Sequence, residues 1–208
     1  MSTRSQQEAI WEALPEGLAP ESFALRRDFL LAHVARGERV LDVGCGEGAF
    51  AAELAGAGAD VLAVDVAQEP LERAARAHPG LATALIDPDG RWELPDAAYD
   101  VVWAGEVIEH VADTAAWLSE VRRVLRSGGR LLLTTPDTGP VTLIWMAISR
   151  RAFSERMDPR SDHLRFYNAS TITELLRDFG FGEVAVRHAG GLPGSRAHLL
   201  VTAIRSRY

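Results

Sequence analysis

Two glutamates and a histidine form the run Glu106-x-x-Glu109-His110, and a second histidine, His163, follows 53 residues later. If the run lies on a helical turn, Glu106 and His110 share one face, with Glu109 beside them. Two carboxylates and an imidazole that converge can bind a divalent cation such as Mg²⁺ or Mn²⁺, with His163 as a fourth ligand. A histidine can also act without metal as a general base. Three readings stay open for His110 and His163: metal ligands, base or substrate contact, or structural residues.

A glycine turn earlier in the chain predicts a second chemical feature, a nucleoside site. Gly44, Gly46 and Gly48 follow a short apolar strand, so a ligand can lie against nearly bare backbone. Asp65 ends the next apolar run, 21 residues after Gly44, where a carboxylate can accept hydrogen bonds from both ribose hydroxyls. Asp42, just before the turn, would repel a pyrophosphate but attract a cationic ligand. This favours S-adenosylmethionine, which carries an ammonium and a sulfonium and no phosphate.

The elements that must position these residues alternate along the chain. The pattern predicts a short helix and loop over 1–20 and a helix over 21–36, followed by alternating short strands and helices. Such alternation predicts an α/β fold with a parallel sheet whose carboxyl edge holds the ligand. The expected strands are 39–43, 60–64, 82–86, 99–104 and 130–135, the expected helices are 49–57, 69–77, 114–125, 142–151 and 169–179, and a final hairpin pairs 183–187 with 197–204.

The stretches VLDVGCGEG, YDVVWAGEVIEHV and LRSGGRLLLTTP, together with Asp65, resemble the ordered motifs of class I S-adenosylmethionine-dependent methyltransferases. The resemblance covers about 38–136. It implies a Rossmann-like, mostly parallel seven-stranded sheet with an antiparallel edge hairpin and helices on both faces. It also implies one methyltransferase domain made of an N-terminal helical cap (1–37), a cofactor-binding core (38–136), a substrate-pocket insertion (137–168) and a C-terminal helix and hairpin (169–208).

The same resemblance assigns roles to single residues. The glycine turn supplies backbone contacts, Asp42 faces the methionine end, and Asp65 with Val66 holds the ribose. An acidic residue after the third strand lies beside the adenine amino group, with Asp87 as the first choice and Asp89 as its competitor. His110 is the first candidate for the chemistry and His163 the second. The expected cofactor residues are Asp42, Gly44, Cys45, Gly46, Asp65, Val66, Asp87 and Glu106, and the expected metal ligands are Glu106, Glu109, His110 and His163.

The E-x-x-E-H run is similar to that of ubiquinone-pathway O-methyltransferases and of small-RNA 3′-end 2′-O-methyltransferases, and the latter bind a metal through it. The expected function is therefore methyl transfer to a small-molecule acceptor, most readily at oxygen, with a divalent cation as an optional partner. Two alternatives remain: an RNA 3′-end 2′-O-methyltransferase, and a non-catalytic S-adenosylmethionine-binding partner protein.

The composition of the chain limits the classes of partner that the protein is expected to bind. The 208 residues carry a net charge of −7, which disfavours nucleic acid, and the single cysteine, Cys45, excludes an internal disulfide. The longest apolar run, 141–148, is too short to span a bilayer, so a cytoplasmic location is expected. The one basic cluster is either a solvated face or, beside the apolar residues 143–146, a peripheral contact with an anionic membrane or a lipid-linked substrate. It comprises Arg150, Arg151, Arg156, Arg160 and Arg165.

Overall fold

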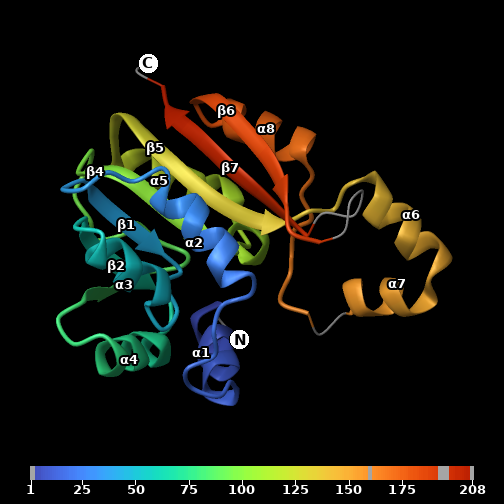
Figure 1. Ribbon diagram of the computed structural model, residues 1–208, viewed down its shortest axis with the longest axis horizontal. Helices are drawn as coiled ribbons and strands as arrows, with labels where there is room; N and C mark the ends of the chain where they lie inside the picture. The colour runs from blue at the N-terminus through green and yellow to red at the C-terminus, as the bar shows by residue number, and fades with distance from the viewer. Residues whose placement is uncertain (1–2, 159–160, 192–196, 207–208) are drawn as a thin grey trace.

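The computed structural model describes residues 3–158, 161–191 and 197–206, and it contains one seven-stranded sheet (Figure 1). The strand order is β3-β2-β1-β4-β5-β7-β6. Strands β1 to β5 run parallel, and β7 pairs antiparallel with both β5 and β6. The expected mostly parallel sheet with an antiparallel edge hairpin is therefore confirmed. The strands are β1 (Arg39–Val43), β2 (Asp60–Asp65), β3 (Ala82–Leu85), β4 (Tyr99–Gly105), β5 (Leu125–Pro136), β6 (Phe181–Ala189) and β7 (His198–Arg205).

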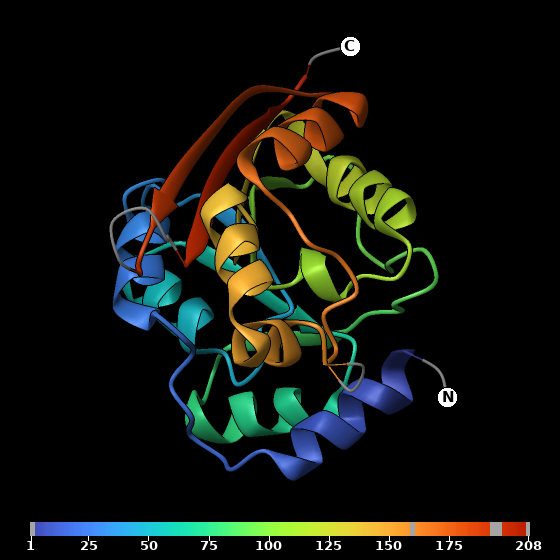
Figure 2. The same cartoon turned by 90° about the vertical axis from the view of Figure 1, so that its right-hand side faces the viewer.

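Helices cover both faces of the sheet, because each central strand is apolar on both sides. Val40 of β1 belongs to a core cluster that includes residues of α2 and α3, whereas Leu41 and Val43 belong to a second cluster that includes residues of α5 and α8. Figure 2 shows helices on both sides of the sheet. The helices are α1 (Thr3–Ala13), α2 (Phe23–Leu31), α3 (Ala49–Gly56), α4 (Gln68–Ala77), α5 (Thr114–Val124), α6 (Pro140–Ile148), α7 (Arg150–Arg156) and α8 (Ala169–Asp178), with a 3₁₀ turn η1 at Ile108–His110.

Three expected boundaries differ from the structure. The helix expected over 21–36 is the shorter α2, which ends in a tightened turn where the amide of His33 bonds to the carbonyl of Leu30. The helix expected over 142–151 is two helices, because the Ser149 hydroxyl accepts a hydrogen bond from the Ala152 amide and starts α7. The strand expected over 130–135 begins earlier, at Leu125, so the glycines at 128–129 lie within β5. A Cβ on Gly129 would sit only 3.1 Å from the Asp100 carbonyl oxygen.

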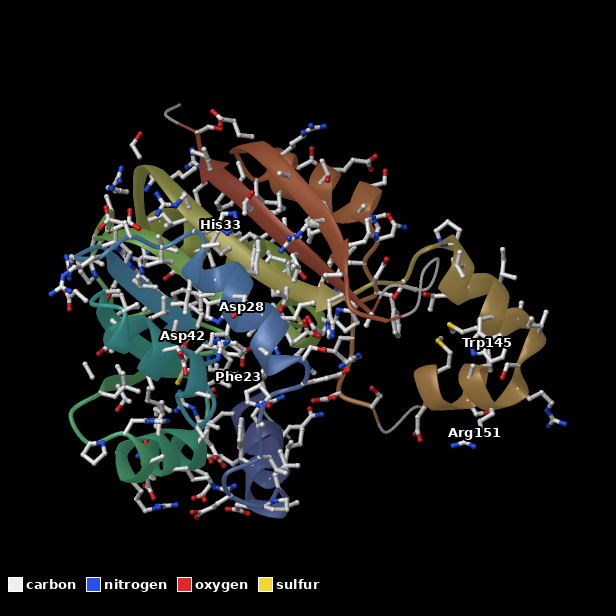
Figure 3. All side chains as sticks on the ribbon, viewed as in Figure 1. Phe23, Asp28, His33, Asp42, Trp145 and Arg151 are labelled. Atoms are coloured by element: carbon white, nitrogen blue, oxygen red, sulfur yellow. The ribbon has the colours of Figure 1, made fainter. Side chains whose placement is uncertain are left out.

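The α6–α7 arm, defined as residues 140–156, projects from the carboxyl edge of the sheet (Figure 1). Trp145 and Arg151 on this arm lie well away from the sheet, whereas Asp42 lies among the packed elements (Figure 3). In the part of the chain that the structure describes, we find no helix with the length and apolar character needed to cross a bilayer.

Candidate functional site

The glycine turn after β1 is built in a conformation that favours glycine. Gly44, Gly46 and Gly48 have φ of 70°, 54° and 80°, in the left-handed region. A Cβ on Gly44 would lie 2.5 Å from a methyl group of Val107, and one on Gly46 would lie 2.9 Å from the Trp11 ring. The turn therefore requires glycine both for its backbone angles and for the close approach of its neighbours.

The amides of this turn are already engaged within the protein. Those of Gly44 and Cys45 donate to the Val64 carbonyl oxygen at 2.8 and 3.0 Å, and that of Gly46 donates to Oδ2 of Asp65 at 3.1 Å. A phosphate needs free N–H donors, as at the glycine loops of dinucleotide sites. With these three amides occupied, the turn is poorly suited to a phosphate, in agreement with the charge argument from Asp42.

Asp65 is held rigidly at the end of β2. It is 5% exposed, and its Oδ1 accepts a second hydrogen bond, from the Ala67 amide at 3.1 Å. Burial raises the pKa of Asp65 to about 6, although the amide hydrogen bonds favour its ionised form. The carboxylate is thus fixed in orientation beside the cleft, as the sequence predicts for a group that binds a ribose.

The main cleft, with a volume of about 270 Å³, opens at the carboxyl edge of the sheet between the glycine turn and α1. Its wall runs from Asp65, Val66 and Ile86 past Glu106 to His110 and Asp162. The residues expected to bind the nucleoside, Asp65 and Val66, and the candidate catalytic residue His110 therefore line one continuous cavity. A second cavity shares Trp11, Gly44 and Glu106 with the first, and extends along the glycine turn to Arg26.

Asp87 is not among the residues that line the main cleft, whereas Asp89 is. Oδ1 of Asp87 instead accepts a hydrogen bond from the Asp89 amide at 3.0 Å, so this side chain stabilises the turn after β3. Of the two aspartates considered for the adenine side, Asp89 is therefore the one that lines the cleft.

The run Glu106 to His110 does not form one helical turn. Glu106 has a φ of 56°, and only Ile108–His110 make the short η1 turn, so the three side chains are not arranged on one helical turn. Ligand atoms of Glu109, His110 and His163 lie within 4.8 Å of one another, but Glu106 does not join them. Among the described residues, the expected four-residue metal set is therefore a set of three.

A loop brings His163 to this cluster. The backbone oxygen of Glu109 accepts hydrogen bonds from the amides of Leu164 and Arg165 at 2.7 and 3.0 Å. The rings of His110 and His163 meet edge to face, with centroids 4.7 Å apart. The 53-residue separation in sequence is thus closed by backbone hydrogen bonds to the residue that precedes His110.

His110 is oriented by an acid that sequence reasoning missed. Its Nδ1 lies 3.1 Å from Oδ2 of Asp162 and 3.1 Å from the Asp162 carbonyl oxygen. Burial lowers the pKa of His110, but the Asp162 hydrogen bond and the charge of Glu109 outweigh it and raise the pKa above its ordinary value. With Nδ1 donating to Asp162, Nε2 is the nitrogen left to accept a proton.

Glu109 is the buried acid of this cluster. It is 1% exposed, and its Oε2 accepts a hydrogen bond from the Thr135 hydroxyl at 3.0 Å. Burial and the charge of Glu106 raise its pKa to about 7. Its other oxygen, Oε1, has no hydrogen-bond partner in the described part of the chain. A cation or a proton at that oxygen would remove the cost of the buried charge.

Two further charged residues lie near the glycine turn, and the sequence analysis did not single them out. Arg26 of α2 is 3% exposed, and its guanidinium lies 4.8 Å from the Phe50 ring centroid. A Cβ on Gly105 would collide with Nη2 of Arg26, so the glycine makes room for the guanidinium. His198 of β7 is also buried, and its Nδ1 lies 3.5 Å from Oε1 of Glu106. The sequence could have indicated Arg26, because it is an arginine among the apolar positions of 21–36. Nothing in the residues next to His198 indicates its role.

Comparison with known proteins decides the family. A model described as a methyltransferase domain matches residues 16–186, more than three quarters of the chain. The chain belongs to this methyltransferase family. Its relatives include a protein of Mycolicibacterium smegmatis named "Probable S-adenosylmethionine-dependent methyltransferase", 36% identical over 193 residues that cover 85% of this chain and 67% of the relative.

Other relatives of the methyltransferase bear more specific names. The ubiquinone biosynthesis O-methyltransferase of Aeromonas salmonicida is 32% identical over 75% of this chain and 66% of its own length. A Mycobacterium tuberculosis relative is matched over only 50% of its length, so the chain spans about half to two thirds of these curated proteins. A solved structure with a similar fold is phosphoethanolamine N-methyltransferase 2 of Haemonchus contortus in complex with S-adenosyl-L-methionine. It has a TM-score of 0.78 and 18% sequence identity, and the match covers 100% of this chain and 60% of that protein's chain. This similarity shows that the two proteins share a fold.

S-adenosylmethionine is the cofactor of this family, and the charges of the methyltransferase suit it. The methionine end of this cofactor carries both a carboxylate and an ammonium. Three buried polar atoms near the glycine turn have no hydrogen-bond partner within the described residues: Nε of Arg26, Oδ2 of Asp42 and Oε1 of Glu106. One cation and two acids are complementary to such a zwitterion.

Proposed function

We propose that the methyltransferase transfers the methyl group of S-adenosylmethionine to a hydroxyl group of a small-molecule acceptor, with His110 at the reacting end. The observation that carries this proposal is the single cleft that joins Asp65 to the His110–Asp162 pair. In this proposal Asp65 and Val66 hold the ribose, Asp89 the adenine side, and the glycine turn the methionine end through Gly44, Cys45 and Gly46.

His110 supplies what a hydroxyl acceptor lacks. When bound, the cofactor provides an electrophilic methyl group on a positively charged sulfur. A neutral hydroxyl is a weak nucleophile, so a base must take its proton as the new oxygen–carbon bond forms and the carbon–sulfur bond breaks. Nε2 of His110 receives that proton, and Asp162 holds the ring in the required tautomer and stabilises the resulting cation, in the same way as the acid of a catalytic triad.

The test is methyl transfer from labelled S-adenosylmethionine to a panel of phenols, catechols, aliphatic diols and amines. We expect the H110A variant to lose about 100-fold in kcat on the hydroxyl acceptors, within the range of general base catalysis. His33→Ala is the matched control, because the His33 side chain is exposed, its Nδ1 and ring contact Phe29, and it does not line the cleft. Turnover of amines alone, or full activity of H110A, would refute the assignment.

A divalent cation is the second way in which the same side chains could activate a hydroxyl. Glu109, His110 and His163 would be its protein ligands, because their ligand atoms lie within 4.8 Å of one another and Glu106 is not part of this group. Calorimetric titration of Mn²⁺ into protein loaded with S-adenosylhomocysteine separates the two mechanisms. Saturable binding that is lost in both H110A and H163A supports metal assistance. Absence of binding, with activity that survives chelation, leaves proton transfer to His110.

We also propose that the α6–α7 arm brings the methyltransferase to an anionic membrane, where it would meet an amphiphilic acceptor. The arm exposes large apolar side chains that a water-facing helix rarely carries together: Val141, Leu143, Ile144, Trp145, Ile148 and Phe153, each between 48% and 73% exposed. Arg150 and Arg151 beside them are exposed, in a chain of net charge −7. An apolar helix flanked by arginines is suited to an anionic lipid surface.

Sedimentation with vesicles tests this contact. We expect binding to vesicles that contain phosphatidylserine and little binding to neutral phosphatidylcholine vesicles. The double substitution I144S/W145S should abolish binding, whereas Leu18→Ser, at a residue 57% exposed outside the arm, should not change it. Equal behaviour of the two variants would contradict a role for the arm.

A further inference from the structure

His198 connects two elements that border the methionine end of the cleft. It is the first residue of β7, 2% exposed, and pairs with Pro136 on one side and Ala189 on the other. Its Nε2 lies 2.9 Å from the hydroxyl of Ser22, 176 positions earlier in the chain. Its Nδ1 lies 3.5 Å from Oε1 of Glu106 at the end of β4. One buried ring therefore bridges the start of α2 and the end of a central strand.

The Ser22 hydroxyl contacts His198 and does not cap helix α2. Ser22 occupies the N-cap position of α2, where a serine hydroxyl ordinarily accepts a hydrogen bond from an amide of the first turn. Here the side chain makes no such bond, and its hydroxyl is engaged with His198. A local rule of helix capping is thus broken in favour of a long-range contact, which is typical of residues that serve a site.

Two of the residues that His198 contacts, Ser22 and Glu106, have strained backbones, whereas a third, Glu21, whose Oε1 lies 3.9 Å from Nε2, does not. Ser22 has a φ of 51° and Glu106 a φ of 56°, values that residues with a side chain rarely adopt. Such strain persists only where the surrounding structure enforces it, and it clusters at ligand-binding sites. The same imidazole contacts both strained residues, so we infer that their positions are linked.

These two contacts fix the two charges that face the methionine end. Arg26 follows Ser22 by one helical turn, with its amide bonded to the Ser22 carbonyl oxygen at 3.1 Å. The position of Ser22 therefore sets where the Arg26 guanidinium lies against Gly105. Glu106 lines both cavities beside Gly44, whereas His198 lines neither. His198 can thus affect a bound ligand only through its neighbours.

We propose that His198 is a positioning residue for the amino-acid end of S-adenosylmethionine: it holds Glu106 toward the ammonium and, through Ser22, holds Arg26 toward the carboxylate. This inference rests on cofactor binding by the methyltransferase and is independent of the acceptor and of any metal. It also gives Glu106 a role other than metal ligation, in line with its absence from the group of Glu109, His110 and His163.

Two ligands separate positioning from a general loss of structure. S-adenosylhomocysteine has the amino-acid end, and 5′-methylthioadenosine has the same nucleoside without it. For His198→Ala we expect calorimetry to show about tenfold weaker binding of S-adenosylhomocysteine, the effect of losing one charge-assisted contact. Binding of 5′-methylthioadenosine should change less than twofold. His198→Asn, which replaces Nδ1 by an amide donor to Glu106 but has no counterpart of Nε2 for Ser22, should restore only the part of the loss that comes from Glu106.

His188→Ala is the matched control. His188 lies on the neighbouring strand β6, is 46% exposed and bonds to Asp137 at 2.7 Å, outside both cavities. It should leave both affinities unchanged. If His198→Ala does not fold, Ser22→Ala carries the test, with the same selective loss expected. An equal loss for both ligands, or no loss for either, overturns the proposal, whereas a wild-type protein that binds neither ligand would refute cofactor binding itself.

Discussion

Asp42 is a buried acid whose ionisation should destabilise the folded methyltransferase. It is 1% exposed, and its Oδ2 has no hydrogen-bond partner among the residues that the structure describes. Burial and the negative charge of Asp65 raise the pKa of Asp42 from 3.8 to about 7, against the opposing effect of Arg26. In Figure 3 this side chain lies within the packed body, whereas Asp28 lies on α2.

The sign of the pH dependence follows from the raised pKa. Between pH 3.8 and about 7, Asp42 is ionised in the unfolded chain and protonated in the folded one. The unfolded state then binds fewer protons, so the free energy of unfolding falls as pH rises through this window and levels off above it. A pKa difference of about 3, at 1.36 kcal/mol for each pH unit, corresponds to at most about 4 kcal/mol at pH 8.

Asp42→Asn removes the ionisable group and keeps the shape of the side chain. We expect the variant to be more stable than the wild type at pH 8, and this gain to exceed the gain at pH 5 by about 2–3 kcal/mol. Urea unfolding followed by circular dichroism at both pH values measures the difference. The variant should bind S-adenosylhomocysteine more weakly, because it has lost a charge near the ammonium.

Asp28→Asn is the control for this experiment. Asp28 is 68% exposed and pairs with Arg27 at 2.8 Å, so its removal should change the free energy of unfolding by less than about 1 kcal/mol at either pH. A D42N variant that is less stable than the wild type at pH 8, or equally stabilised at both pH values, would refute the reasoning.

Three further predictions follow from single contacts. Gly105→Ala should weaken binding of S-adenosylhomocysteine about tenfold in calorimetry, because its Cβ would meet both the Arg26 guanidinium and the buried Trp103 ring, 2.6 Å away, and unchanged affinity would show that these side chains have room to move. Asn168→Ala should lower the free energy of unfolding by about 1 kcal/mol in urea, because Asn168 forms a capping box with Thr171 at the start of α8, and Ser127→Ala at an exposed position of β5 is its control. Leu133→Ala should cost about 2–5 kcal/mol in the same assay, since Leu133 is fully buried in β5, and a loss below 1 kcal/mol would contradict its packing.

The features that could be predicted from the sequence are those encoded within a few neighbouring residues. The glycine turn, Asp65 at the end of its strand and the Asn168 cap each combine a residue type with a short spacing, and the structure contains all three. The sheet topology was equally accessible, because apolar strands that alternate with helices allow few arrangements. Local patterns therefore determine the framework and the cofactor side of the cleft.

The rest of the site depends on contacts that join distant segments. Arg26, Asp162 and His198 acquire their roles from partners on other elements, and no spacing in the sequence links Ser22 with His198. The helical turn considered for Glu106 to His110 does not form, because Glu106 lies in the left-handed region and only Ile108–His110 make a short 3₁₀ turn. A glutamate in the left-handed region cannot be recognised from the sequence, because glutamate has no preference for that conformation.

The position of β7 in the sheet also determines when the domain can fold during synthesis. β7 is the last strand along the chain, yet it lies between β5 and β6 and bonds to both. Until residues 198–205 have left the ribosome, β6 has no partner, one edge of β5 is open, and Ser22 and Glu106 lack their contacts with His198. The growing chain must therefore keep two unpaired strand edges from pairing with other chains. Pairing of this half of the sheet and formation of the His198 contacts are consequently one late event.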